Sequence, residues 1–198
     1  TYKIWVDAAS ELADLAKKMK KLTRTVGKSG SPTVNRRNLE KLQKWVVDSS
    51  KTSQRFSRDY LRISGNSITR TNAAIAELRS NSNFLDSIED DPEAIAELYG
   101  GDHNAYLRDK RKAPENPTGV IRNLEKRREE TARKRREIKT AGKAAESVRR
   151  NASEELTHAK SKAKKLEALK KYNRDMETIN NYVNKVLSST GPETPPEE

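Results

Sequence analysis

The stretch that decides the fold is residues 120–187, which read VIRNLEKRREETARKRREIKTAGKAAESVRRNASEELTHAKSKAKKLEALKKYNRDMETINNYVNKVL. This stretch contains no proline, and Gly142 is its only glycine. Because proline and glycine are the residues that most often end helices, the pattern predicts one very long α-helix, to which we assign residues 118–190. At about 1.5 Å per residue it would span on the order of 100 Å, far more than a compact domain of this size needs.

The first part of this predicted helix is strongly basic. Over residues 122–143 there are ten lysine and arginine residues against four glutamates. The cations are Arg122, Lys126, Arg127, Arg128, Arg133, Lys134, Arg135, Arg136, Lys139 and Lys143. An apolar seam traced backward from Ile138 meets arginine and threonine, so we expect residues 124–138 to have no face that can be buried.

Two interpretations of this basic segment remain open. It is either an exposed helix held by pairs such as Glu125 with Arg128, each contributing about 0.2–0.5 kcal/mol, or an anion-binding surface. The cations exceed what such pairing needs, which favours anion binding. We therefore predict that the ten cations neutralise nucleic-acid phosphates without reading base sequence.

The composition sets limits on the fold. Of 198 residues, 32% are hydrophobic and 35% are charged, so the chain cannot build one thick core. Thin helical layers need apolar residues on one stripe only, and the apolar residues are indeed periodic. The net charge of +12 points to a polyanionic partner.

Two further amphipathic helices are predicted in the amino-terminal part. Residues 1–22 form the first, residues 23–37 form a polar loop, and residues 38–79 form a long second helix in which Gly65 is a candidate kink. The seam of the second helix is weakened by serines. A secondary basic patch consists of Lys17, Lys18, Lys20, Lys21, Arg36 and Arg37.

Residues 80–117 predict one or two short helices and a proline-bearing connector, together forming an elbow. Asp91-Pro92 is a typical helix start and Gly100-Gly101 a typical stop. The elbow is acidic, which indicates either a solvated helix amino terminus or a surface that docks on a basic helix of a neighbouring subunit. Residues 191–198 predict a disordered acidic tail.

The predicted fold class is all-α: an elongated helical hairpin or bundle with two long helices, a shorter amino-terminal helix and a small helical elbow. From Ile138 onward the last helix carries an alanine-rich seam of the coiled-coil kind. A single helix of that length would extend beyond any partner in its own chain. We therefore expect the protein to form oligomers.

Signals for catalysis are absent from the sequence. Gly27-Lys28-Ser29 lacks the first glycine of a phosphate-binding loop, and His103 and His158 lack the spacing of metal ligands. There is no cysteine. Trp5 and Trp45 lie on apolar stripes and are expected to anchor the core. We predict a non-enzymatic protein with no cofactor, no metal site and no small-molecule substrate.

Three functions fit these features. The first is a structural protein that self-associates and binds nucleic acid through phosphates, as a coat, nucleocapsid or packaging subunit does. The second is a helical module that binds an anionic membrane surface, although the basic segment lacks the interleaved large apolar residues of an inserting helix. The third is a coiled-coil adaptor for an acidic protein. With no membrane-spanning run and no signal peptide, the expected location is intracellular or inside a nucleoprotein particle.

Overall fold

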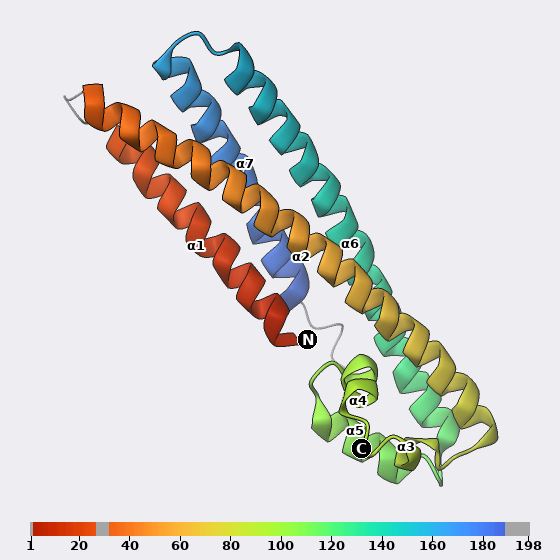
Figure 1. Ribbon diagram of the computed structural model, residues 1–198. Helices are drawn as coiled ribbons and strands as arrows, with labels where there is room; N and C mark the ends of the chain where they lie inside the picture. The colour runs from red at the N-terminus through yellow and green to blue at the C-terminus, as the bar shows by residue number, and fades with distance from the viewer. Residues whose placement is uncertain (1, 27–31, 189–198) are drawn as a thin grey trace. The chain divides into compact units, whose positions relative to one another are not determined.

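The structure is a computed structural model that describes residues 2–26 and 32–188. In this part of the chain every regular element is a helix, which confirms the all-α class (Figure 1). The elements are α1 (Tyr2–Val26), α2 (Pro32–Ser80), α3 (Phe84–Ser87), α4 (Pro92–Tyr99), α5 (His103–Lys112), α6 (Pro117–His158) and α7 (Lys162–Ser188). Two of them are long, as expected: α2 has 49 residues and α6 has 42.

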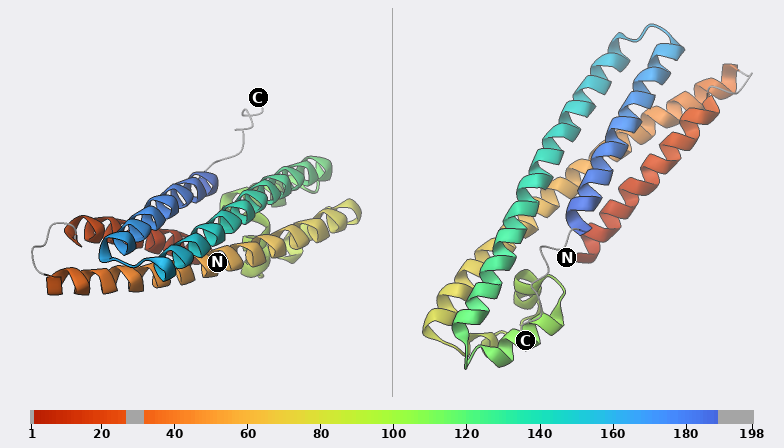
Figure 2. Two further views of the ribbon diagram at one scale, coloured as in Figure 1. Left: turned by 90° about the horizontal axis from the view of Figure 1, so that it is seen from above. Right: turned by 180° about the vertical axis from the view of Figure 1, so that it is seen from behind.

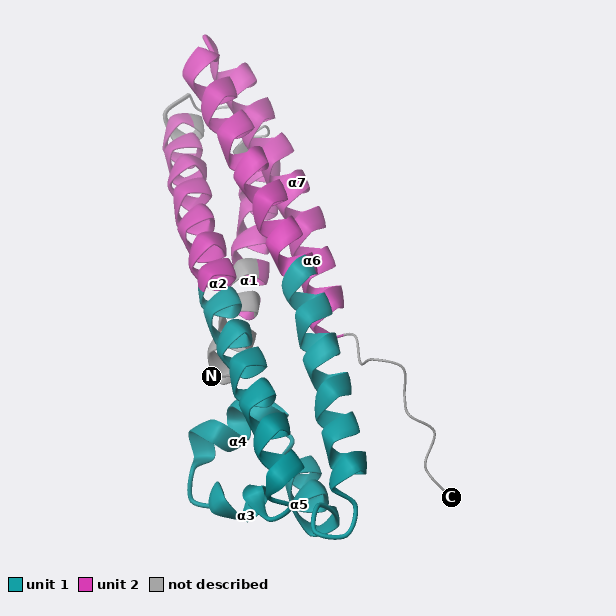
Figure 3. Cartoon of the chain, turned by 90° about the vertical axis from the view of Figure 1, so that its right-hand side faces the viewer, with its two compact units in different colours: residues 1–3, 59–136, 190–198 teal, residues 4–58, 137–189 magenta. Residues whose placement is uncertain are grey.

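The chain divides into two compact units, and both long helices run through both of them (Figure 3). Unit 1 contains residues 59–136 together with the chain ends at 1–3 and 190–198. Unit 2 contains residues 4–58 and 137–189. Each unit has its own core and is described separately.

Unit 2 is a four-helix arrangement of α1, the first part of α2, the second part of α6, and α7 (Figure 2). Its core consists of two small clusters that combine alanines with larger apolar side chains. Met19, Ala145, Tyr172 and Met176 pack together with Trp45 against them, and Leu39, Leu42 and Leu169 form a second cluster. The predicted seam of α2 is confirmed, including its serines: Ser49 and Ser53 are buried, and the Ser49 hydroxyl lies 3.0 Å from the Tyr172 hydroxyl.

Unit 1 packs the short helices against the other halves of α2 and α6. Its core joins Ile75 and Leu78 of α2, Leu98 and Tyr99 of α4, and Leu124 of α6. The start of α4 is as predicted, because the Asp91 carboxylate accepts a hydrogen bond of 3.1 Å from the Ala94 N–H. Its stop is also as predicted: Gly100 has a φ of 66°, a conformation that favours glycine.

The prediction of one helix over residues 118–190 is wrong, because α6 ends at His158 and α7 begins at Lys162. The Ser161 hydroxyl accepts a hydrogen bond of 3.2 Å from the Lys164 N–H, which caps the new helix. The chain then turns back, so that Leu156 and Leu166 join one apolar cluster. Lys171 pairs with Glu155 at 3.2 Å, whereas an unbroken helix would separate them by about 24 Å.

Other boundaries also need correction. The polar loop predicted for residues 23–37 is mostly helix, because α1 continues to Val26 and α2 begins at Pro32, where proline suits the first turn of a helix. Gly65 does not break α2. The elbow holds three short helices rather than one or two. The tail at 191–198 and the motif Gly27-Lys28-Ser29 lie outside the described residues.

Candidate nucleic-acid interface

The predicted basic segment is shared between the units. Its first eight cations, from Arg122 to Arg136, belong to unit 1, and Lys139 and Lys143 belong to unit 2. Arg122, Lys126, Arg136, Lys139 and Lys143 are exposed, and the other five are half-buried. The expectation that residues 124–138 have no buriable face holds for residues 125–137, none of which is buried, and is wrong at the two ends, Leu124 and Ile138. Leu124 is completely buried, because it packs against the short helices of unit 1 rather than along the seam that contains Ile138.

Arg127 is held by unit 1 itself. A guanidinium nitrogen lies 3.5 Å from the Asp102 carboxylate, and the guanidinium carbon lies 5.2 Å from the centre of the Tyr99 ring. The first contact is an ion pair and the second a cation–π interaction. A phosphate would have to compete with both partners for this side chain.

Three more arginines of the segment also have partners within the unit. Arg128 donates to the Asn72 amide oxygen at 2.8 Å, Arg133 donates to the Glu130 carboxylate at 3.2 Å, and Arg135 donates to the Leu61 carbonyl at 3.5 Å. The Arg133 guanidinium also holds the pKa of the Glu130 carboxyl below its usual value. The partner of Arg128 in these contacts is therefore Asn72 rather than Glu125, the partner expected from the sequence. Four of the ten cations of the segment are therefore engaged by partners within unit 1.

A buried polar network lies beside Arg127. The Tyr99 hydroxyl donates to the Asp109 carboxylate at 3.0 Å, and the Asn123 amide donates to its other oxygen at 3.4 Å. Burial raises the pKa of Asp109, and the two hydrogen bonds oppose that shift. Burial also raises the pKa of the Tyr99 hydroxyl. The network links α4, α5 and α6, and the side chains of Tyr99 and Asp109 within it are buried.

The secondary basic patch has different surroundings. All six of its residues, Lys17, Lys18, Lys20, Lys21, Arg36 and Arg37, are exposed in unit 2. Lys20 lies 3.8 Å from Glu177, and Arg36 lies 3.4 Å from Glu40, both in exposed pairs. Lys17, Lys18 and Lys21 have no ion-pair partner among the described residues.

On α1 these lysines, with Arg24, form a surface that we call the α1 basic face: Lys17, Lys18, Lys20, Lys21 and Arg24. A hollow of about 500 Å³ lies on it, lined by four of these cations and Thr25. Between residues 15 and 26 the helix carries no carboxylate. Arg24 lies in the last turn of α1, where the helix dipole stabilises a cation and offsets part of the repulsion among these neighbours.

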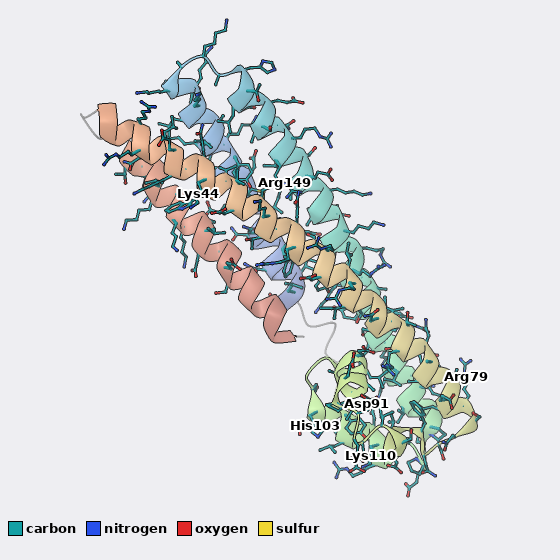
Figure 4. The ribbon with its side chains drawn as sticks, in the orientation of Figure 1. Lys44, Arg79, Asp91, His103, Lys110 and Arg149 are labelled. Carbon is teal, nitrogen blue, oxygen red and sulfur yellow. The ribbon has the colours of Figure 1, made fainter. Side chains whose placement is uncertain are left out.

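A second array of cations lies on α2. Arg37, Lys44, Lys51 and Arg58 recur every seven residues, and all four are exposed. We call this array the α2 row; Lys44, in its middle, is labelled in Figure 4. Because seven residues are close to two helical turns, the row follows one side of the helix, opposite the buried Leu42, Ser49 and Phe56.

The two units differ in charge. Residues 4–58 and 137–189, which form unit 2, contain 25 lysines and arginines against 12 aspartates and glutamates, a net charge of +13. The remaining residues, which form unit 1, contain 16 against 17, a net charge of −1. The positive field of the protein therefore belongs to unit 2, although the densest run of arginines lies in unit 1.

Sequence reasoning missed three members of the α2 row, Lys44, Lys51 and Arg58. The signal was present in their seven-residue spacing on the polar side of the predicted helix over residues 38–79. A search for runs of adjacent cations does not detect such a pattern, because its members are seven residues apart in the sequence. Arg24, which lines the hollow, was missed as well and could have been found by extending the first helix by one turn.

The described residues contain no group of three or more histidine, aspartate and glutamate side chains placed to hold a metal ion. His103 and His158 are both exposed, as expected. In unit 2, Tyr172 is buried near Arg149 (Figure 4 labels Arg149) and bonded to Ser49. Burial raises the pKa of the Tyr172 hydroxyl, so this group stays protonated near neutral pH.

None of the helices in the described part of the chain combines the length and the apolar character needed to cross a membrane. Comparison with known proteins finds no matching family model, no significantly similar curated protein and no significantly similar solved structure.

Proposed function

We propose that the protein is a non-enzymatic structural protein that binds nucleic acid through its phosphates, without reading base sequence. The observation that carries this proposal is the α1 basic face. It presents five exposed cations, and the one ion pair among them is long and solvated, with Lys20 51% exposed and Glu177 40% exposed. Such cations remain available for phosphates, because exposed pairs contribute only about 0–1 kcal/mol and are readily exchanged.

Phosphate binding needs charge and shape, and unit 2 supplies both. Each phosphate that a lysine or arginine neutralises releases condensed counterions, which provides affinity independent of sequence. The hollow on the α1 basic face places four cations around one space of about 500 Å³. The net charge of +13 on unit 2 adds long-range attraction for a polyanion.

Self-association remains a prediction. The expectation of oligomers from the sequence depended on one unbroken helix that would be longer than any helix available to pack against it in the same chain. The helix instead ends at His158 and the chain folds back through α7, so that argument no longer applies. The apolar seams of the helices in unit 2 pack against one another within one chain, in the clusters that contain Met19 and Leu42.

The proposal is tested by fluorescence anisotropy with random-sequence nucleic acid over a range of salt concentrations. Replacing Lys17, Lys20, Lys21 and Arg24 with Gln should weaken binding by about tenfold or more at 0.1 M salt and lower the slope of log affinity against log salt by about 3–4. A matched control replaces Arg108, Arg111, Arg122 and Lys126, four exposed cations of unit 1, with Gln. The control should change affinity by less than about threefold.

Three results would contradict the proposal. One is the absence of salt-dependent binding to nucleic acid. Another is tighter binding to vesicles that contain an anionic lipid, which would favour the membrane module. The last is a larger loss from the unit 1 control than from the α1 variant, which would return the interface to the basic segment. Circular dichroism of both variants should show wild-type helicity, since glutamine is a good helix former.

A further inference from the structure

We infer that the nucleic acid bound by this protein is double-stranded, and that the α2 row is the track along which the duplex lies. This inference rests on the proposed function and adds to it the class of nucleic acid and a second contact surface. Three features of unit 2 support it: the geometry of the row, its freedom from neutralising partners, and the placement of the aromatic side chains.

The row is straight and evenly spaced. Arg37 and Arg58 are 21 residues apart on one helix, so the row extends over about 32 Å with a cation about every 10.5 Å. One turn of duplex DNA is about 34–36 Å long. The four cations therefore reach along almost one full turn of a duplex whose axis follows the helix.

The row is also largely free of carboxylates. None of its four members has an ion-pair partner among the described residues. Lys41 and Arg55 flank it on one side; both are exposed, and Arg55 pairs with Glu11 at 3.1 Å. Asp48 is the acidic residue on that flank, and exposed Glu40, which lies between Arg37 and Lys44 on the other flank, pairs with Arg36 at 3.4 Å. Neighbouring cations of the row lie about one Debye length apart at 0.1 M salt, so they repel one another little.

A rigid row of this kind favours a duplex over a single strand. Double-stranded DNA presents about one phosphate charge per 1.7 Å of axis and is stiff over about 150 base pairs, so the row faces a dense and rigid line of negative charge that loses little further freedom on binding. A single strand would have to be held straight over about 32 Å, which costs backbone entropy for each ordered nucleotide. It also releases fewer counterions per contact, about 0.7 rather than 0.9.

Binding of single strands usually depends on exposed aromatic side chains on which bases stack. Along α2 in unit 2, the helix that carries the row, the aromatic residues are Trp45 and Phe56. Phe56 is 3% exposed, and Trp45 packs on the core cluster around Met19. The exposed surface of α2 in unit 2 therefore offers charge without a stacking platform, which suits a duplex whose bases are already stacked.

The test compares a labelled 20-base-pair DNA duplex with its own 20-nucleotide single strand, at equal salt and by anisotropy. The wild-type protein should bind the duplex at least about tenfold more tightly at 0.1 M salt. Replacing Arg37, Lys44, Lys51 and Arg58 with Gln should weaken duplex binding by about thirtyfold or more and lower the salt slope by about 3–4. The matched control replaces Lys164, Lys170, Arg174 and Lys185, exposed cations of α7 with the same total charge, and should cost less than about threefold.

The outcomes separate this inference from the proposed function. If the single strand binds as tightly as the duplex, the duplex inference is wrong while phosphate binding stands. If the α2 variant and the α7 control lose equal affinity, the row is not the track. If neither nucleic acid binds, the proposed function itself fails. The comparison between duplex and single strand uses the wild-type chain alone, so it does not depend on how the variants fold.

Discussion

The basic segment at the start of α6 and the basic face of α1 have similar local compositions but different surroundings. In unit 1, Asp102, Tyr99 and Glu130 are positioned to take up arginines of the segment. In unit 2, the α1 basic face has only Glu177 as a described ion-pair partner, at 3.8 Å. The comparison shows that the density of cations in a sequence does not locate an interface unless the carboxylates that fold beside them are known.

The difference follows from the positions of the acidic residues. The elbow between α2 and α6 contributes Asp86, Glu89, Glu97 and Asp102, which pair with Lys110, Arg70 and Arg127. These pairs lie within unit 1, where cations of the same unit partly neutralise the acidic residues of the elbow. Unit 2 has no comparable acidic insertion, and its excess cations face solvent.

The largest effect expected is loss of the core that anchors the basic segment. Leu124→Ala removes a completely buried side chain and should destabilise unit 1 by about 2–5 kcal/mol. Hydrogen exchange followed by mass spectrometry should show faster exchange in α4 and α5. At temperatures where unit 2 stays protected, affinity for nucleic acid should remain within about threefold of wild type.

The matched variant is Leu169→Ala, which removes an equally buried side chain from unit 2. It should speed exchange in α1 and α7 and weaken nucleic-acid binding as unit 2 loosens. A Leu124→Ala protein that loses binding while unit 2 keeps its protection would mean that unit 1 holds the interface.

A smaller effect is expected for Arg127→Gln. The ion pair with Asp102 is partly exposed, and the contact with the Tyr99 ring adds a cation–π term, so the loss in unfolding free energy should be about 1 kcal/mol. Urea denaturation measures it. The control is Arg122→Gln, at an exposed position of the same basic segment. This substitution should change the free energy of unfolding by less than about 0.5 kcal/mol. Equal effects of the two substitutions would mean that Arg127 has no structural role.

The smallest effect concerns pH and Asp109. Its pKa is raised in the folded state by burial, so its contribution to stability is fully present below the unfolded pKa and is lost as pH rises through the folded pKa. The wild type should therefore gain stability relative to Asp109→Asn as pH falls from about 7 to about 3. Other carboxylates titrate over the same range, and the difference between the two proteins removes their contribution. A difference that stays constant with pH would show that Asp109 ionises normally.

Much of the fold could be predicted from the sequence, since it depends on local patterns. The seam of α2 through Leu42, Ser49 and Phe56 is visible as spacings of three and four, and the ends of α4 follow from Asp91-Pro92 and Gly100. The end of α6 after His158 could not be predicted from helix-breaking residues, because the connection contains neither proline nor glycine. The residue that caps α7, Ser161, also occurs inside helices. The turn is stabilised instead by packing of Leu156 with Leu166, which is a tertiary effect.

The candidate site was predicted in part. The lysines of α1 were recognised as a basic patch, but the basic segment of α6 was preferred because its cations are more numerous. Whether Arg127 or Arg128 is available for a phosphate depends on Asp102 and Asn72, which are distant in sequence and meet them only in the folded unit. Exposure of Lys17 and Lys21, by contrast, follows from their position on the polar side of one helix.

The most direct test of the central claim is a lysine-modification footprint of the wild-type protein, read by mass spectrometry with and without a 20-base-pair duplex. The account predicts that the duplex protects Lys17, Lys18 and Lys21 on α1 and Lys44 and Lys51 on α2. It predicts no protection of Lys112 and Lys126, which are exposed in unit 1. Protection of Lys126 with continued modification of the α1 and α2 lysines would contradict the account.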